Sequence, residues 1–304
     1  MTDPAVNKVL VSGSSGLIGT SLVRSMRESR IAVIRLVRGR AKGPDEVQWN
    51  PATGEAAGGP AALEGLRAAI HLSGANLSAH RWTAAYKKEI VDSRVVSTRA
   101  LVGLLKRLKA PPETLLCASA IGIYGDRGDE VLTEGSTPGT GFLAETCRAW
   151  EAEAEQAAEA GMRVVELRTG VVLARKGGAL DKMLPLFRAG LGGRLGSGEQ
   201  WMSWIVLSDW VRAARHILET DAIRGPVNMV SPMPVTNAGF TRALGAAVHR
   251  PAVIPAPAFA LRVALGEMAD AALLASERVI PQRLAETGFH FDFPEVGAAL
   301  KLLV

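Results

Sequence analysis

Short apolar runs alternate with longer amphipathic stretches along the first half of the chain. The apolar runs are nearly continuous and fall at residues 8–12, 31–37, 69–73, 114–119 and 163–167. Helical periodicity appears between them, at residues 17–29, 83–108 and 142–160. Strands buried on both faces read as continuous apolar runs, and their alternation with helices is typical of βαβ units. The pattern therefore predicts an α/β fold with a doubly wound parallel sheet.

The pattern changes after residue 173, where glycine becomes frequent. The pair Gly177 and Gly178 and the segment 190–198 predict loops, because glycine is unfavourable inside regular elements. We expect a helix over 208–219, a strand over 227–230, and a helix over 236–249 with Thr236 or Asn237 as its N-cap. The chain is therefore predicted to form a larger domain over residues 1–230, with insertions from about residue 174, and a smaller C-terminal α/β subdomain over 231–304.

Three shorter segments carry their own signals. Turn residues within 47–54 predict a small hairpin or excursion after the second strand. Three prolines between residues 251 and 257 predict a stiff, extended connector. The apolar stretch 258–274 is interrupted by Arg262, Glu267 and Asp270, which is too much charge for a membrane span. That stretch predicts a packed amphipathic helix.

The strongest local signal is the segment VLVSGSSGLIG, in which a strand runs into Gly13, Gly16 and Gly19 and then directly into a helix. Glycine there lets the backbone turn sharply and approach a pyrophosphate, whose charge is held by amides at the helix N-terminus. The spacing is one residue wider at its first gap than the usual fingerprint, and an ordinary β–α turn is the alternative. Its place after the first strand predicts dinucleotide binding.

The residues after the second strand indicate which dinucleotide binds. A site for NAD(H) places Asp or Glu about 20 residues beyond the glycine loop, to bind ribose hydroxyls. Between Glu28 and Asp45 the chain has no acid and five basic residues, of which Arg38 lies just past the strand. A guanidinium there can pair bidentately with a ribose 2′-phosphate. The sequence therefore favours NADP(H), with Arg38 as phosphate ligand; a solvated basic loop is the alternative.

Composition narrows the functional classes. The 304 residues include 35 basic and 30 acidic side chains, and the basic residues are scattered without a nucleic-acid recognition motif. Cys117 and Cys147 are too few for a disulfide framework, and neither they nor the five histidines have metal-ligand spacing. The first strand begins at Lys8, which leaves no room for a signal peptide. We therefore expect a cytoplasmic protein without a metal, nucleic-acid or membrane partner.

Several motifs occur together and in order along the chain. Besides the glycine loop they are LSG at 72–74, SAIGIYG at 119–125, RTGVVL at 168–173, GSGEQWMSWI at 196–205 and IPQRL at 280–284. With these motifs the whole chain resembles the extended short-chain dehydrogenase/reductases. More narrowly, it resembles the epimerase family proteins, which are similar to nucleotide-sugar epimerases and end in a C-terminal domain of unknown function. The resemblance implies a Rossmann-type fold and an NADP(H) site, and a homodimer is common in such folds.

The resemblance also implies which residues bind the cofactor. They are Gly13, Gly16, Leu17, Ile18, Gly19, Arg38, Leu72 and Ser73, together with Glu89, Arg94 and Val172. The strand ends among them converge on the crevice where the sheet order reverses, which is where a dinucleotide binds. Val172 is expected in the loop beside the nicotinamide end. Without the resemblance, Glu89 and Arg94 would be taken for an exposed pair on a helix.

Catalysis in this superfamily normally uses a Tyr-x-x-x-Lys pair, in which the lysine lowers the pKa of the tyrosine. The pair is absent here, since neither Tyr86 nor Tyr124 is followed by lysine four residues later. Counting back from Glu151 on the helix that should carry the pair places the vacant positions at Leu143 and Cys147. The usual source of the proton is therefore missing.

Two other groups of residues are candidates for the chemistry. Ala120 takes the place of the usual serine, which leaves Tyr124 as the candidate proton donor and Ser119 as its hydrogen-bonding helper. The alternative for Tyr124 is a packed aromatic ring with a satisfied hydroxyl. Trp201 and Trp204 follow a glycine-rich loop and are expected either to wall a substrate pocket or to seal the interdomain core.

Two functions fit these observations. The first is an NADP(H)-dependent oxidoreductase, epimerase or dehydratase that acts on a small polar or nucleotide-sugar-like substrate under the C-terminal subdomain. The second is a non-catalytic, NADP(H)-dependent regulatory or sensor protein, linked to cell division as some relatives are. The glycine loop fits both functions, and the missing tyrosine and lysine favour the second.

Overall fold

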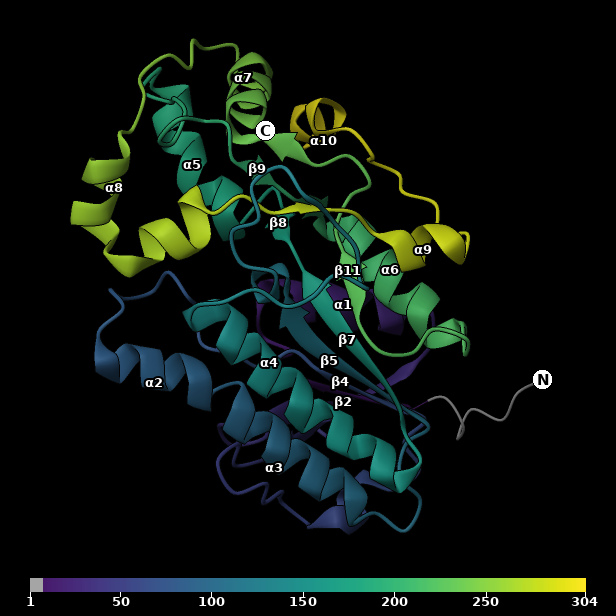
Figure 1. Cartoon of the computed structure of the whole chain (residues 1–304). Helices are drawn as coiled ribbons and strands as arrows, with labels where there is room; N and C mark the ends of the chain where they lie inside the picture. Colours follow the sequence, from purple (N-terminus) through teal and green to yellow (C-terminus); the bar gives the residue numbers. More distant parts are fainter. Residues whose placement is uncertain (1–7) are drawn as a thin grey trace.

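The computed structural model describes residues 8–304 and is built around a seven-stranded sheet (Figure 1). Its strands are β1 (Lys8–Ser12), β2 (Ala32–Val37), β3 (Glu46–Gln48), β4 (Ala68–His71), β5 (Thr114–Ala120), β7 (Arg163–Thr169) and β11 (Val227–Met229). They are ordered β11-β7-β5-β4-β1-β2-β3, and every neighbouring pair is parallel. The strand order reverses between β1 and β4, so the predicted doubly wound, Rossmann-type α/β fold is confirmed. The expectation about a signal peptide concerns residues 1–7, outside the described range.

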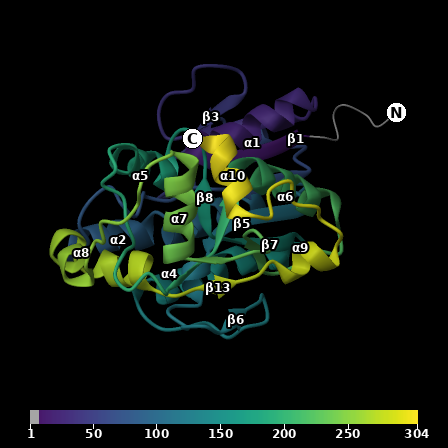
Figure 2. The same ribbon diagram turned by 90° about the horizontal axis from the view of Figure 1, so that it is seen from above.

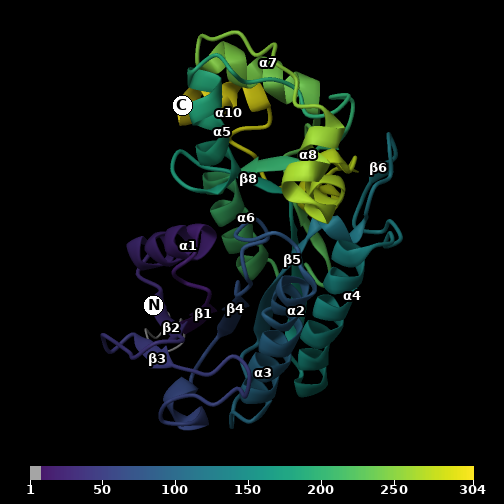
Figure 3. The same cartoon turned by 90° about the vertical axis from the view of Figure 1, so that its left-hand side faces the viewer.

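Helices cover both faces of the sheet (Figure 3). They are α1 (Leu17–Glu28) and α6 (Leu207–Glu219) on one face, and α3 (Val95–Lys106) and α4 (Phe142–Glu155), with α2 (Ala84–Asp92) beside them, on the other. Side chains of a strand alternate between the faces. Val9 and Val11 accordingly belong to the core under α1 and α6, whereas Leu10 belongs to the core under α3 and α4. Burial on both faces explains the continuous apolar runs.

Most remaining elements lie above the carboxyl ends of the strands (Figures 1 and 2). They are β6 (Val131–Leu132), β8 (Val171–Leu173), α5 (Gly178–Arg188), β9 (Trp201–Met202), β10 (Trp204–Val206), β12 (Val235–Thr236), α7 (Asn237–Ala247), α8 (Ala258–Leu265), β13 (Arg278–Val279), α9 (Gln282–Glu286) and α10 (Val296–Leu303). An upper core joins α5, α7 and α10, and includes Phe187 and Phe240. Leu284 and Phe291, by contrast, reach the core under α1 and α6. Because the upper core draws on both sides of Ser231, the domain boundary there stays a prediction.

The helix predicted over residues 83–108 is wrong in one respect, because it is broken between α2 and α3. The side chains of Ser93 and Arg94 both donate to the carbonyl of Ile90, each at 3.1 Å. Ser93 also accepts from the amide of Ala75 at 2.9 Å, and Arg94 donates to the carbonyl of Ala75 at 3.0 Å. Side-chain donors thus occupy the carbonyl that would continue the helix, and they attach the break to the loop after β4.

Two further predictions are corrected by the structure. The predicted helix over 258–274 is interrupted at Gly266, whose φ of +65° ends α8, and the chain then forms a separate π-helical turn over Ala269–Leu274. Helix α8 is not packed, since Phe259 and Val263 are 70% and 73% exposed. The segment 47–54 is an excursion as predicted, with Trp49 bridged to Ala56, but it starts from an edge strand of the sheet, β3.

None of the helices in residues 8–304 has the length and apolar character that a membrane crossing requires.

Candidate functional site

A cleft of about 1160 Å³ opens at the carboxyl ends of β1, β2 and β4. It is lined by the β1–α1 loop (residues 13–16), the segment that ends and follows β2 (residues 36–40), and the loop after β4 (residues 72–76). Ligands of doubly wound sheets bind at this edge, where the strand order reverses. The cleft is therefore the candidate site.

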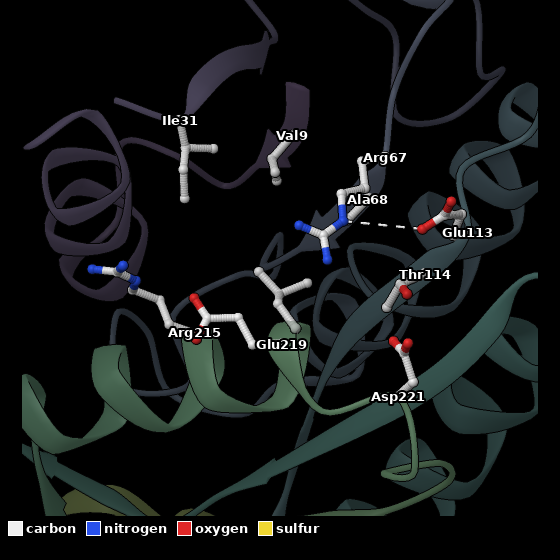
Figure 4. Close-up of a pocket in the computed structure, with 10 residues that line it drawn as sticks. Val9, Ile31, Arg67, Ala68, Glu113, Thr114, Arg215, Glu219 and Asp221 are labelled. Carbon is white, nitrogen blue, oxygen red and sulfur yellow. Dashed lines mark ion pairs between the residues drawn. The ribbon is translucent and has the colours of Figure 1, made fainter. Parts of the chain in front are cut away.

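A second cavity lies at the opposite edge of the sheet, near the amino ends of β1 and β4 (Figure 4). It measures about 60 Å³ and is bordered by Val9, Arg215 and Asp221, with Arg67 and Glu113 forming an ion pair at 4.0 Å. A cavity of this size holds water molecules and is far too small for a nucleotide. We assign it no function.

The β1–α1 loop requires glycine and ends in free amides. Gly13 has a φ of +68°, and a Cβ there would lie 2.5 Å from the carbonyl oxygen of Leu72. A Cβ on Gly19 would lie 2.3 Å from the carbonyl oxygen of Gly13. Within residues 8–304, the amides of Leu17, Ile18 and Gly19 donate to no protein acceptor, and no acid occupies the first turn of α1. Free amides at a helix N-terminus make a site for an anion.

Positive charge gathers at the end of β2. Arg38 and Arg40 are exposed and line the cleft, and no ion pair in the described part of the chain involves either of them. Arg35 differs, because its guanidinium lies 3.2 Å from Asp45 and 2.7 Å from Glu46. The two carboxylates neutralise Arg35, so Arg38 and Arg40 are the arginines of this strand end whose charge is available to a ligand.

A buried histidine supports the floor of the cleft. His71 at the end of β4 is fully buried; its Nδ1 lies 2.5 Å from the hydroxyl of Ser12 and its Nε2 lies 3.2 Å from that of Ser97. Burial lowers the pKa of His71 to about 3, so the ring is neutral at physiological pH. His71 therefore joins β1, β4 and α3 without adding charge to the site.

The structure brings most of the predicted cofactor ligands together. Gly13, Gly16, Arg38, Leu72, Ser73 and Glu89 line the cleft, and Leu17, Ile18 and Gly19 carry the free amides beside it. Arg94 holds the loop after β4 rather than lining the cleft. Val172 does not line the cleft either and packs against the core under α1 and α6. Sequence analysis missed Asn76, His80 and Tyr86, which line the cleft as well. Asn76 and His80 lie in the loop after β4, which was an available signal for them, whereas Tyr86 lies on α2.

Tyr124 and Ser119 lie inside the protein rather than in the cleft. Tyr124 is fully buried; its hydroxyl donates to Asn228 Oδ1 at 2.7 Å and accepts from Arg168 Nη1 at 3.0 Å. Ser119 donates to Glu151 Oε1 at 2.5 Å, and Arg168 pairs with the same carboxylate at 2.8 Å. Burial raises the pKa of Tyr124. These contacts fit the packed aromatic with a satisfied hydroxyl, and we propose no proton transfer through Tyr124.

The two positions on α4 where the sequence analysis expects the missing pair, Leu143 and Cys147, also lack a usable proton. Leu143 has none to exchange, and burial, reinforced by the charge of Glu151, raises the pKa of Cys147 to about 12. Trp204 is fully buried in the upper core, whereas Trp201 is half-buried and does not line the cleft. Of the two expected roles, sealing of the core is therefore the one that fits Trp204.

Glu166 on β7 makes stability depend on pH. It is 1% exposed, and neither carboxylate oxygen has a hydrogen-bond partner in residues 8–304. Burial, with the nearby Glu155, raises its pKa, so the folded protein holds a proton that the unfolded chain releases above the ordinary glutamate pKa. The free energy of unfolding is therefore not reduced by Glu166 at acidic pH. It falls as the pH rises toward the folded pKa of Glu166, by at most ~1.4 kcal/mol per pH unit.

We expect Glu166→Gln to flatten this dependence. Urea unfolding between pH 5 and pH 8 should show a smaller fall in the free energy of unfolding for Glu166→Gln than for the wild type. The matched control is Glu28→Gln, at an exposed position on α1. Parallel pH profiles for the wild type and Glu166→Gln would show that the buried carboxyl is ionised in the folded protein.

The sheet order, the glycine loop and the basic strand end define an α/β protein of the dinucleotide-binding, Rossmann type. Residues 9–229 match the NAD dependent epimerase/dehydratase family, and residues 256–303 match a domain of unknown function. The chain therefore belongs to the NAD-dependent epimerase/dehydratase family, which confirms the resemblance drawn from its motifs.

Relatives extend along nearly the whole chain. An epimerase family protein of Mycobacterium bovis is 45% identical over 292 residues, which cover 96% of each chain. The crystal structure of human epimerase family protein SDR39U1 with NADPH has a TM-score of 0.87 at 33% identity, and covers 97% of this chain and 98% of that one. The UDP-glucose 4-epimerase of Thermotoga maritima shares the fold, with a TM-score of 0.77 at 16% identity over 97% of both chains.

Proposed function

We propose that this protein binds NADP(H) in the cleft and acts as an oxidoreductase or epimerase on a small polar or nucleotide-sugar-like substrate. The observation that carries the proposal is the pairing of free amides in the β1–α1 loop with the uncompensated Arg38 and Arg40 at the end of β2. The human relative crystallised with NADPH supports this choice of cofactor.

The residues of the cleft fit this cofactor in size and charge. The amides of Leu17, Ile18 and Gly19 would hold the pyrophosphate, and Arg38 would hold the 2′-phosphate. When bound, the reduced cofactor supplies a hydride from its nicotinamide ring. Arg94 is a positioning residue, because its donors are committed to backbone carbonyls and its guanidinium lies 5.3 Å from the centre of the Trp150 ring.

The alternative function is a non-catalytic NADP(H)-dependent regulatory or sensor protein. The hydrophobic Leu143 and the inert Cys147 at the vacant positions favour it. Oxidation of NADPH in the presence of carbonyl compounds and nucleotide sugars separates the two functions. Turnover of any of these compounds supports an enzyme, whereas tight NADPH binding without turnover across the set supports a sensor.

Removing the guanidinium at position 38 should change cofactor preference. We expect Arg38→Ala to weaken NADPH binding by about 10- to 100-fold, the worth of a charge-assisted hydrogen bond to phosphate, and to leave NADH binding unchanged. Isothermal titration calorimetry with both cofactors measures this. Arg24→Ala, at an exposed arginine on α1, is the matched control and should bind both cofactors as the wild type does. An unchanged NADPH preference in Arg38→Ala would contradict the phosphate role.

A further inference from the structure

The carboxyl end of β5 lies against the first turn of α4. The serine and the tyrosine that are usual there in this superfamily are missing. The short 3-10 helix Ile121–Ile123 follows Ala120, which stands where a serine is usual. A Cβ on Gly122 would lie 3.3 Å from Cβ of Leu143, so the two segments are in contact at the vacant tyrosine position. None of the three residues at this contact, Ala120, Gly122 and Leu143, has a side chain that can exchange a proton.

The carboxyl group of Glu277, which is distant in sequence, lies beside these two segments. Oε1 of Glu277 lies 4.0 Å from the position of a Cβ on Gly122, so Glu277 and Leu143 flank the same backbone. Glu277 is half-buried, and its carboxylate takes part in no hydrogen bond or ion pair among residues 8–304. Glu277 is therefore an uncommitted carboxyl beside the position that lacks a proton donor.

The backbone around Glu277 is firmly held. Its amide donates to the carbonyl of Trp201 at 3.1 Å, and its own carbonyl accepts from the hydroxyl of Ser203 at 2.8 Å. On one side, the hydroxyl of Ser276 donates to the carbonyl of Gly128 at 2.7 Å. On the other, β13 pairs with β6. The carboxyl is therefore presented by a fixed segment and not by a loose loop.

Two ionisable groups from other segments interact with Glu277. Asp126 lies in the loop after the 3-10 helix, and Cys147 lies on α4. Arg94, at the break between α2 and α3, acts on Cys147. Burial, reinforced by the charge of Asp126, raises the pKa of Glu277 to about 8. At neutral pH the carboxyl carries a proton that it is able to give up, which is the condition that a general acid must meet.

We propose that Glu277 exchanges the proton in this site, in place of the missing tyrosine; this rests on the proposed NADP(H) function. In the reduction of a ketone or aldehyde, the carbonyl carbon accepts a hydride from the reduced nicotinamide, and the carbonyl oxygen accepts the proton of Glu277. The products are an alcohol, the oxidised cofactor and the Glu277 carboxylate, which regains its proton from water. The C-terminal segment thereby becomes part of the reactive centre.

The test compares Glu277→Gln, which keeps the shape of the side chain without a titrating proton, with Glu199→Gln at an exposed position. Three measurements are made on the full chain: the NADPH affinity by calorimetry, the infrared spectrum of the NADPH-free protein at pH 7, and NADPH oxidation with nitrobenzaldehyde, diacetyl and phenanthrenequinone. We expect unchanged NADPH affinity and a kcat lowered by ~100-fold or more. The protonated-carboxyl absorption should be weaker in Glu277→Gln alone, and the part that remains belongs to the buried Glu166. In the wild type, kcat should fall above about pH 8.

The outcomes separate this inference from the function on which it rests. If the wild type does not bind NADPH, the proposed function fails and Glu277 loses its role with it. If the wild type binds NADPH but reduces no carbonyl compound, the sensor function is favoured, and the role of Glu277 fails together with the enzymatic function. If the wild type binds NADPH and reduces a carbonyl compound, two results overturn the role of Glu277 alone: Glu277→Gln turns over as fast as the wild type, or the infrared band is the same in both proteins.

Discussion

Alanine at position 13 should abolish NADPH binding and lower the free energy of unfolding by ~2–4 kcal/mol. Gly13 has a φ of +68°, which an L-residue adopts only with strain, and a Cβ there would lie 2.5 Å from the backbone of Leu72. Relief of that overlap must move the β1–α1 loop or the end of β4, and both line the cleft. Urea unfolding and calorimetry with NADPH measure the two effects.

Gly103→Ala is the control for this substitution. Gly103 is exposed within α3, and a Cβ there would have no atom within 4 Å. Alanine is a better helix former than glycine, so the variant should be more stable than the wild type by about 0.5–1 kcal/mol and should bind NADPH normally. If Gly13→Ala behaved like Gly103→Ala, the close approach between the β1–α1 loop and β4 would not be needed for binding.

Removal of the buried carboxylate of Glu151 should have the other large effect, a loss of about 3–5 kcal/mol of stability. Glu151 accepts from Ser119 and pairs with the guanidinium of Arg168 at 2.8 Å, and the two charged side chains are only 14% and 7% exposed. In Glu151→Ala the positive charge of Arg168 would be left buried without its counter-charge. Chemical denaturation of Glu151→Ala and the wild type at the same pH gives the difference.

The matched control, Glu153, lies two residues from Glu151 and pairs with an arginine at the surface. Glu153 pairs with Arg99, which is 64% exposed, so water screens the pair and Glu153→Ala should cost less than about 1 kcal/mol. Equal losses for Glu151→Ala and Glu153→Ala would show that the Arg168 pair contributes no more than a surface ion pair.

The fold was largely predictable because its signals are local. Each central strand is buried on both faces, so its apolar run stands out from the amphipathic helices beside it. The glycine loop is equally local, since Gly13 and Gly19 are required by contacts within one turn of chain and the adjacent strand end. The edge strand β3 escaped prediction because three residues are too few to show a periodic pattern.

The parts of the site that escaped prediction depend on contacts between distant segments. The break after α2 arises because Ser93 and Arg94 bond to the loop at Ala75, and the helical periodicity on both sides gives no sign of it. The hydrogen bonds of Tyr124 depend on Arg168 and Asn228, which are brought to it by other strands. Propensities of neighbouring residues carry no information about such partners.

The placement of Leu284 and Phe291 has a consequence for how the protein is made. These residues complete the core that Val9 and Val11 begin, although they are synthesised more than 270 residues later. Until Leu284 and Phe291 have been synthesised, the apolar face of the sheet toward α1 and α6 is incompletely covered, and exposed apolar faces in nascent chains are sites of aggregation. The native packing of this face therefore cannot be completed before Leu284 and Phe291 are made, and we expect a nascent chain stalled before Leu284 to bind a chaperone.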